Sequence, residues 1–168
     1  AKLASDIVRA VADGKVEFAV EGEEAHISAG RSEFSLRVIP ADEFPQLPEP
    51  ADREVQIDAA AFRDALRQVT PAASADDSRP ILTGVLMAAE SDGLRLVATD
   101  SYRLAVRDLP QSSMLGAGQK VLVPGRALAE LQRFLSGDDE LTVRLGAREA
   151  VFVVGGTRLT TRLIEGEY

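Results

Sequence analysis

Residues 79–109 read RPILTGVLMAAESDGLRLVATDSYRLAVRDL, and this stretch decides the fold. From Leu94 to Thr99, the residues Leu94, Leu96 and Ala98 alternate with Arg95, Val97 and Thr99, the period of two that is typical of a strand with one buried face. The Ser-Asp-Gly sequence at 91–93 predicts a tight turn before it, because glycine adopts positive φ without strain. The alternation breaks for two residues and then resumes with Tyr102, Leu104 and Val106. The stretch therefore predicts three strands, near 80–90, 93–99 and 102–108.

The break between the last two predicted strands gathers side chains that suit the binding of a peptide. A hydroxyl, an aromatic ring, a guanidinium and an aliphatic group surround one short turn, at Thr99, Tyr102, Arg103 and Leu104. An ordinary hairpin with mixed side chains has the same composition. Both interpretations stay open at this point.

Length and composition bound the class of protein. A chain of 168 residues with 45% hydrophobic residues can bury a sizeable core, and it has no apolar run long enough to span a bilayer. The absence of cysteine excludes disulfides and thiolate metal sites and fits a reducing cytosol, so we expect a cytoplasmic location without membrane association. The net charge of -8 argues against indiscriminate binding of nucleic acid, although it does not describe how charge is distributed.

The chain contains an internal repeat. Residues 3–39 and 127–164 each have the pattern of a helix followed by three strands, and their turn glycines coincide. Residues 54–109 repeat this order after a short leading strand, with Asp58 as the N-cap of the helix. Chance similarity between two α+β segments is the alternative. Because one βαβββ unit cannot cover both faces of its sheet, we expect an α+β fold of paired βαβββ units with helices on one face of antiparallel sheets.

Enzymatic chemistry finds little support in the residues. The single histidine, His26, lies on the polar side of a predicted strand, and Thr99-Asp100-Ser101 has no histidine or lysine nearby to activate a hydroxyl. Asp76-Asp77 lacks a third metal ligand at a sensible spacing, so a solvated loop is preferred. We therefore expect a protein that is not an enzyme and has no cofactor or metal.

The predicted helices carry cations in pairs, four or seven residues apart, so that each pair lies on one helical face. The pairs are Lys2 and Arg9, Arg63 and Arg67, and Arg126 and Arg133. Long cationic side chains contact DNA phosphates independently of sequence. Asp6, Asp64 and Glu130 lie close enough to form local ion pairs with them, so solvated helices with local pairing are the alternative.

Three pieces of the sequence, in this order and at these spacings, resemble the bacterial β sliding clamp family, the processivity ring of the replicative DNA polymerase. They are residues 79–84, residues 98–105 and the Val123-Pro124 pair that opens a helix. The resemblance implies a DNA-clamp fold with residues 1–46 as the second half of a first domain, 47–53 as a linker and 54–168 as a nearly complete second domain. It also implies a fragment that lacks the third domain.

The resemblance further implies a function. A clamp encircles duplex DNA and tethers the replicative DNA polymerase, the clamp loader and repair proteins, and the full-length protein is expected to be a homodimeric ring. Partners of the family insert short hydrophobic motifs into a pocket, which on this chain falls on Arg79, Leu82, Thr99, Ser101, Tyr102, Arg103 and Leu104. Many members have glycine-histidine in place of Ser101-Tyr102. The alternative function is a non-ring peptide-binding or regulatory α+β module unrelated to DNA.

Overall fold

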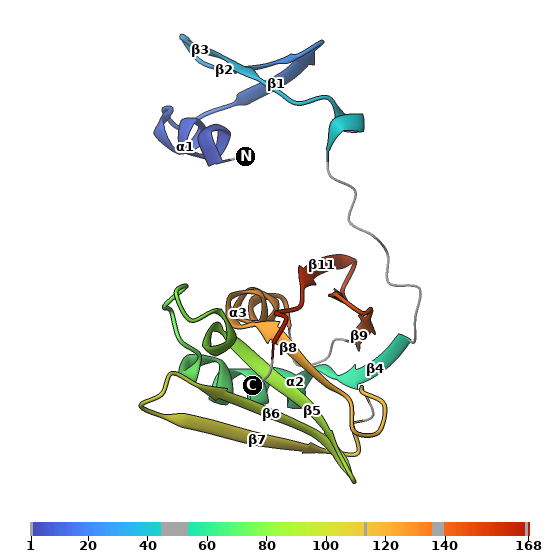
Figure 1. Ribbon diagram of the computed structural model, residues 1–168. Helices are drawn as coiled ribbons and strands as arrows, with labels where there is room; N and C mark the ends of the chain where they lie inside the picture. The colour runs from blue at the N-terminus through green and yellow to red at the C-terminus, as the bar shows by residue number, and fades with distance from the viewer. Residues whose placement is uncertain (1, 45–53, 113, 136–139, 167) are drawn as a thin grey trace. The chain divides into compact units, whose positions relative to one another are not determined.

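The computed structural model describes residues 2–44, 54–112, 114–135, 140–166 and 168 (Figure 1). The chain divides into two units, Ala1–Leu47 (unit 1) and Pro48–Tyr168 (unit 2). Among the described residues, no helix is both long enough and apolar enough to cross a membrane.

Unit 1 is one helix and one antiparallel sheet. Helix α1 (Lys2–Ala10) precedes β1 (Val16–Glu21), β2 (Glu24–Ala29) and β3 (Ser32–Arg37), which pair in the order β1-β2-β3, and a 3₁₀ helix η1 (Ala41–Glu43) follows. The regular helix ends at Ala10, and the Val11 N–H still donates to the Ile7 carbonyl at 3.1 Å.

Unit 2 consists of two successive βαβββ repeats, which confirms the predicted order. The first repeat contains β4 (Glu54–Asp58), α2 (Ala59–Val69), β5 (Gly84–Glu90), β6 (Gly93–Thr99) and β7 (Leu104–Pro110). The second contains β8 (Lys120–Pro124), α3 (Gly125–Phe134), β9 (Glu140–Leu145), β10 (Glu149–Val154) and β11 (Thr157–Arg162). Two 3₁₀ helices, η2 (Thr70–Ala72) and η3 (Pro80–Thr83), lie between α2 and β5. Asp58 is the N-cap of α2, as predicted, because its Oδ1 accepts from the Ala61 N–H at 2.9 Å.

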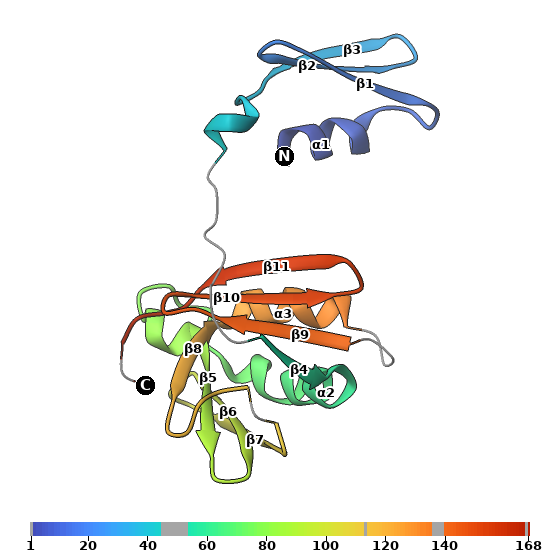
Figure 2. The same cartoon turned by 90° about the vertical axis from the view of Figure 1, so that its right-hand side faces the viewer.

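The two repeats exchange their leading strands. The sheets have the orders β11-β10-β9-β4 and β7-β6-β5-β8, so the first strand of each repeat completes the sheet of the other (Figure 2). Val55 of β4 pairs with Val143 of β9, and Val123 of β8 pairs with Val85 of β5. Neither repeat is complete without its partner, so the two repeats form one domain.

One hydrophobic core joins the repeats. Helices α2 and α3 contact each other, and their buried side chains belong to the same cluster as those of both sheets. The ring of Phe62 on α2 stacks on that of Phe152 on β10 at a centroid distance of 6.5 Å, which connects the helix of one repeat with the sheet of the other. Met114 and Leu115, from the connection between β7 and β8, are also buried in this core.

The three strands of the opening stretch differ from the prediction in two respects. The first begins at Gly84, because Pro80–Thr83 form a 3₁₀ turn in which the Thr83 hydroxyl donates to the Pro80 carbonyl at 2.7 Å. The third begins at Leu104, and Tyr102 lies in the turn before it. Leu104 pairs with Thr99 on the exposed face of β6, so it also faces outward, and Leu109 opposite Leu94 is the buried member of β7. The alternation on β6 is confirmed.

Candidate functional site

The turn between β6 and β7 is held by its own side chains. Asp100 Oδ1 accepts from the backbone N–H groups of Tyr102 and Arg103, both at 3.0 Å, and Oδ2 accepts from Arg103 Nε at 3.0 Å. The Thr99 hydroxyl donates to the Arg103 carbonyl at 2.7 Å and accepts from the Ser101 N–H at 3.2 Å. These local hydrogen bonds compete with strand pairing and end both strands at this point.

Ser101 has left-handed backbone geometry, with φ of 79°. Left-handed geometry costs a residue with a Cβ roughly 1–2 kcal/mol, which glycine avoids. The serine adds a hydroxyl that accepts a hydrogen bond from Arg79 Nη1 at 3.2 Å. Ser101 thus combines a strained backbone with a side-chain contact to the preceding loop.

Two arginines tie the turn to the segment between α2 and β5. Arg103 Nη2 donates to the Pro71 carbonyl at 2.5 Å, and Arg79 Nε donates to Asp76 Oδ2 at 3.0 Å. Asp76 Oδ1 also accepts from the Ser78 N–H and hydroxyl, at 3.0 and 2.6 Å. The Asp76 carboxylate therefore orders the loop before β5 through the hydrogen bonds that it accepts from Ser78 and Arg79.

The seven predicted pocket residues come from two segments that lie together in unit 2. Arg79 contacts Ser101 directly, while Thr99 and Arg103 share a hydrogen bond. Leu104 lies opposite Thr99 on the outer face of the sheet, and Leu82 is half-buried in η3. Tyr102 is 94% exposed, so its side chain points into solvent rather than toward the other six.

Tyr168 also belongs to this neighbourhood, although the sequence analysis did not select it. It lines a cavity of about 560 Å³ together with Leu86, Leu122 and Ile164. Burial raises the pKa of the Tyr168 phenol, and a backbone hydrogen bond with Thr99 acts in the opposite direction. No periodic pattern marks a residue that follows the last strand, so only the folded chain reveals its place beside Thr99.

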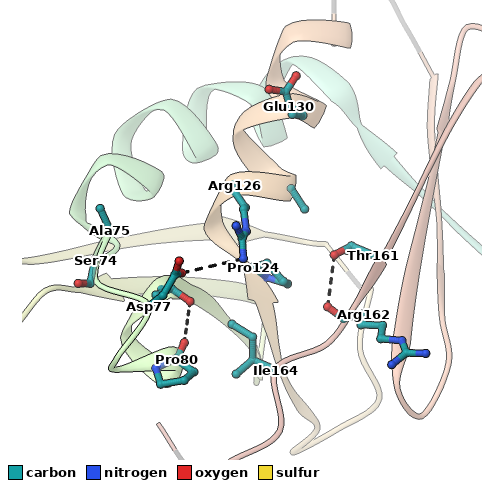
Figure 3. A pocket seen from close by; sticks show the side chains of 12 residues that line it. Ser74, Ala75, Asp77, Pro80, Pro124, Arg126, Glu130, Thr161, Arg162 and Ile164 are labelled. Carbon is teal, nitrogen blue, oxygen red and sulfur yellow. Dashed lines mark hydrogen bonds and ion pairs between the residues drawn. The ribbon is translucent and has the colours of Figure 1, made fainter. Parts of the chain in front are cut away.

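A larger groove, of about 950 Å³, lies beside α3 (Figure 3). Its lining comes from the loop before β5, the start of α3 and the end of β11: Ser74, Ala75, Asp77, Pro80, Thr83, Pro124, Arg126, Ala127, Glu130, Thr161, Arg162 and Ile164. Arg126 Nη2 and Asp77 Oδ1 are 4.0 Å apart across it, and both side chains are largely exposed. The sequence analysis missed this groove because its residues are distant in the chain.

The predicted helical cations of unit 2 all have partners. Arg67 pairs with Asp64 at 2.8 Å and Arg133 with Glu130 at 3.0 Å, which confirms local pairing for these two. Arg63 Nη1 donates to the Leu135 carbonyl at 3.1 Å and so connects α2 with the end of α3. Arg126 has the longest and most exposed contact of the four, the one with Asp77. In unit 1, Lys2 and Arg9 are exposed on α1.

Because the carboxylates of Asp100 and Asp76 hold the turn and the loop before β5, we expect the protein to lose stability in acid. Hydrogen bonds from the Tyr102 and Arg103 N–H groups lower the pKa of Asp100 below its ordinary 3.8, and the Ser78 hydroxyl does the same to the pKa of Asp76. A lowered folded pKa stabilises the fold above the unfolded pKa, and this stabilisation is lost as the pH falls through the folded pKa. We expect the urea midpoint to be nearly constant above about pH 5 and to fall below about pH 4.

The variant Asp100→Asn separates the contribution of this carboxylate. The amide oxygen of the asparagine still accepts hydrogen bonds but carries no charge. The urea midpoint of the variant should therefore be lower than that of the wild type at pH 7 and should change less between pH 5 and pH 3. Urea unfolding of both proteins across this range measures the difference. Equal acid losses for the two proteins would contradict the assignment.

Comparisons with known proteins agree with this architecture. The family model for the DNA polymerase III beta subunit, central domain, matches residues 56–168, and that for its N-terminal domain matches residues 1–48. The beta sliding clamps of Streptomyces coelicolor and Micrococcus luteus are each 36% identical to the chain over 99% of its length, which covers 46% and 55% of their own lengths. The chain thus spans about half the length of these curated relatives.

Solved structures show the same fold. The DNA polymerase sliding clamp of Bacillus subtilis is 30% identical, with a TM-score of 0.78 over 99% of this chain and 45% of its own. The sliding clamp of Pseudomonas aeruginosa bound to griselimycin is 28% identical, with a TM-score of 0.79 over 99% of this chain and 46% of its own. By its repeats, its exchanged strands and these matches, the chain belongs to the DNA polymerase III beta subunit family, the bacterial sliding clamps.

Proposed function

We propose that this chain is part of a DNA polymerase processivity factor that encircles duplex DNA and tethers the polymerase and repair proteins without catalysing a reaction. The observation that carries the proposal is the match to the sliding-clamp family, and the hydrogen bonds of Arg79 with Ser101 and of Thr99 with Arg103 support a partner site at this turn. Family membership favours this function over that of a peptide-binding module unrelated to DNA.

The ring itself belongs to the longer protein. We propose that residues 1–46 are the second half of a first clamp domain, joined by 47–53 to a nearly complete second domain at 54–168. The matched family models support this division. The full-length protein would be a homodimeric ring in the cytoplasm, loaded onto DNA by the clamp loader.

For DNA contact we propose the helical cations Lys2, Arg9, Arg63, Arg67, Arg126 and Arg133. The contacts that these cations already make determine how easily each can turn to a phosphate. Arg63 donates a hydrogen bond to the Leu135 carbonyl, and Arg67 and Arg133 form short local ion pairs. Arg126 makes only a 4.0 Å contact with Asp77, and both groups are well solvated, so it can turn to a phosphate at little cost. Contacts of this kind are independent of sequence and permit sliding.

For partner binding we propose a shallow apolar site formed by Leu82, Thr99 and Leu104, with Arg79 and Arg103 at its edge and Ser101 beside it. Tyr102 of the same turn is exposed and would contact a bound partner from outside the site. Leu104 is 65% exposed, so its side chain is accessible to a hydrophobic partner. The related Pseudomonas aeruginosa clamp in complex with griselimycin shows that a member of the family binds a ligand. Short hydrophobic motifs of polymerase, clamp loader and repair proteins are the proposed ligands here.

Truncation of Leu104 should weaken the binding of such a motif. Leu104→Ala removes an apolar anchor from the site and is expected to cost about 1–2 kcal/mol of binding free energy, which corresponds to about 5- to 30-fold in Kd. A fluorescence titration of the wild type and the variant with one hydrophobic clamp-binding peptide measures the change. Because Leu104 is mostly exposed, the variant should remain folded.

Arg9→Ala is the control for this titration. Arg9 is an exposed residue of α1 in unit 1, so its replacement should leave the affinity for the peptide unchanged. If the wild type binds and folded Leu104→Ala binds equally well, the site is not where we propose it.

A further inference from the structure

The loop at residues 74–79, before β5, is held by one carboxylate, which the sequence analysis interpreted as part of a solvated loop. Asp76 Oδ1 accepts hydrogen bonds from the N–H and the hydroxyl of Ser78, and Oδ2 accepts from Arg79 Nε at 3.0 Å. The Asp76 N–H donates to the Ser74 hydroxyl at 3.1 Å. Both oxygens of the carboxylate therefore have partners within the loop.

Arg79 extends the effect of Asp76 beyond the loop. Its guanidinium donates through Nε to Asp76 and through Nη1 to the hydroxyl of Ser101 at 3.2 Å. Because the guanidinium is planar and rigid, contacts on two of its nitrogens fix the direction of the whole group. Asp76 thus orients a side chain that joins the loop to the turn between β6 and β7.

The backbone of the same loop holds one apolar residue of the proposed partner site. The Leu82 N–H donates to the Arg79 carbonyl at 3.0 Å, and the Leu82 carbonyl accepts from the Ser74 N–H at 2.8 Å. The position of Leu82 therefore depends on the shape of the loop. Asp76 can act on two sides of the site, on Leu82 through the backbone and on Ser101 through Arg79.

The contacts of Asp76 bear more on binding than on global stability. The ion pair between Asp76 and Arg79 is solvated on both sides, and such pairs contribute little to the stability of a fold. A long side chain that is ordered only on binding, in contrast, lowers the affinity by the entropy of its ordering. We propose that Asp76 is a positioning residue of the partner site, which holds Arg79 against Ser101 so that this side of the site is formed before a hydrophobic motif binds. This inference rests on the proposed function and adds to it a residue that acts through Arg79.

The experiment measures the Kd of the full chain for one fluorescent hydrophobic clamp-binding peptide, together with the urea midpoint of each variant. In Asp76→Asn the amide has a single oxygen, which cannot accept from both Ser78 and Arg79. Its Kd should be about 3- to 10-fold higher than that of the wild type, because the Arg79 side chain must now be ordered on binding.

Asp108→Asn is the matched control for this variant. Asp108 also holds an arginine, with Oδ1 at 2.7 Å from Arg95 Nε, but it lies toward the opposite end of the β6–β7 pair from the turn. The control removes the same charge and the same kind of ion pair, so any loss of stability should be similar in the two variants. The Kd of Asp108→Asn for the peptide should equal that of the wild type.

Ser101→Gly separates positioning from stability. Loss of the hydroxyl leaves Arg79 Nη1 without its acceptor and should raise the Kd about as much as Asp76→Asn does. Glycine also relieves the left-handed backbone at φ of 79°, so the urea midpoint should not fall. In the double variant Asp76→Asn/Ser101→Gly, both substitutions remove the same constraint, so its Kd should be no higher than that of the weaker-binding single variant.

The outcomes distinguish the partner site from the role of Asp76. A wild type that does not bind the peptide contradicts the partner site, and the role of Asp76 falls with it. If the wild type binds and either single variant binds equally well, the site stands and the role of Asp76 is wrong. Effects that multiply in the double variant, or an equal rise of the Kd in Asp108→Asn, also overturn the inference. Should Asp76→Asn be unfolded in water, the Kd of Ser101→Gly alone decides.

Discussion

Replacement of Phe62 by alanine is expected to lower the free energy of unfolding of unit 2 by about 3–5 kcal/mol. Phe62 is fully buried, and its ring stacks on Phe152 between the helix of one repeat and the sheet of the other. Truncation removes the transfer free energy of the ring and leaves a cavity that the surrounding strands fill only in part. Because the contact joins the two repeats, the loss should affect unit 2 as a whole.

Urea unfolding followed by tyrosine fluorescence measures this change, since both tyrosines, Tyr102 and Tyr168, lie in unit 2. Phe134→Ala is the matched control, because Phe134 is an aromatic residue at the end of α3 that is 44% exposed. Its truncation should cost about 1 kcal/mol or less. Similar losses for the two variants would mean that the contact between Phe62 and Phe152 does not join the repeats.

Replacement of Gly93 by alanine is expected to cost about 2–3 kcal/mol. A Cβ at this position would lie 2.2 Å from the Leu109 carbonyl oxygen and 2.9 Å from the Pro110 Cα. These are backbone atoms of the paired strand β7, so they cannot move away as the end of a flexible side chain does. To accept the Cβ, the two strands must separate where Gly93 pairs with Pro110. The turn between β6 and β7 lies at the opposite end of the same strand pair.

Gly116→Ala is the control for this variant. The nearest atom to a Cβ at Gly116 is Gln119 Oε1 at 3.5 Å, which is an ordinary contact, so the change in stability should lie within about 0.5 kcal/mol. Urea unfolding of both variants measures the difference. A Gly93→Ala variant as stable as Gly116→Ala would show that the strands tolerate a Cβ at their closest approach.

Local features of this protein were predictable from its sequence. The period-two pattern of Leu94, Leu96 and Ala98 identified β6, and Asp58 marked the start of α2, because strand periodicity and helix capping depend on residues a few positions apart. The repeat predicted βαβββ units, since the same pattern of turns and apolar residues occurs in residues 3–39, 54–109 and 127–164. The candidate pocket residues came from the family resemblance, and the structure brings Arg79 to Ser101.

Tertiary structure alone decided how these local elements were used. The pairing of Leu104 with Thr99 turned Leu104 outward, because residues opposite each other in an antiparallel pair share a face, and no local pattern sets that register. Long-range pairing also exchanged β4 and β8 between the sheets, placed Tyr168 beside Thr99 and formed the groove beside α3. The sequence alone determined the elements and their order, whereas contacts between distant residues determined which faces are buried and which are free to bind.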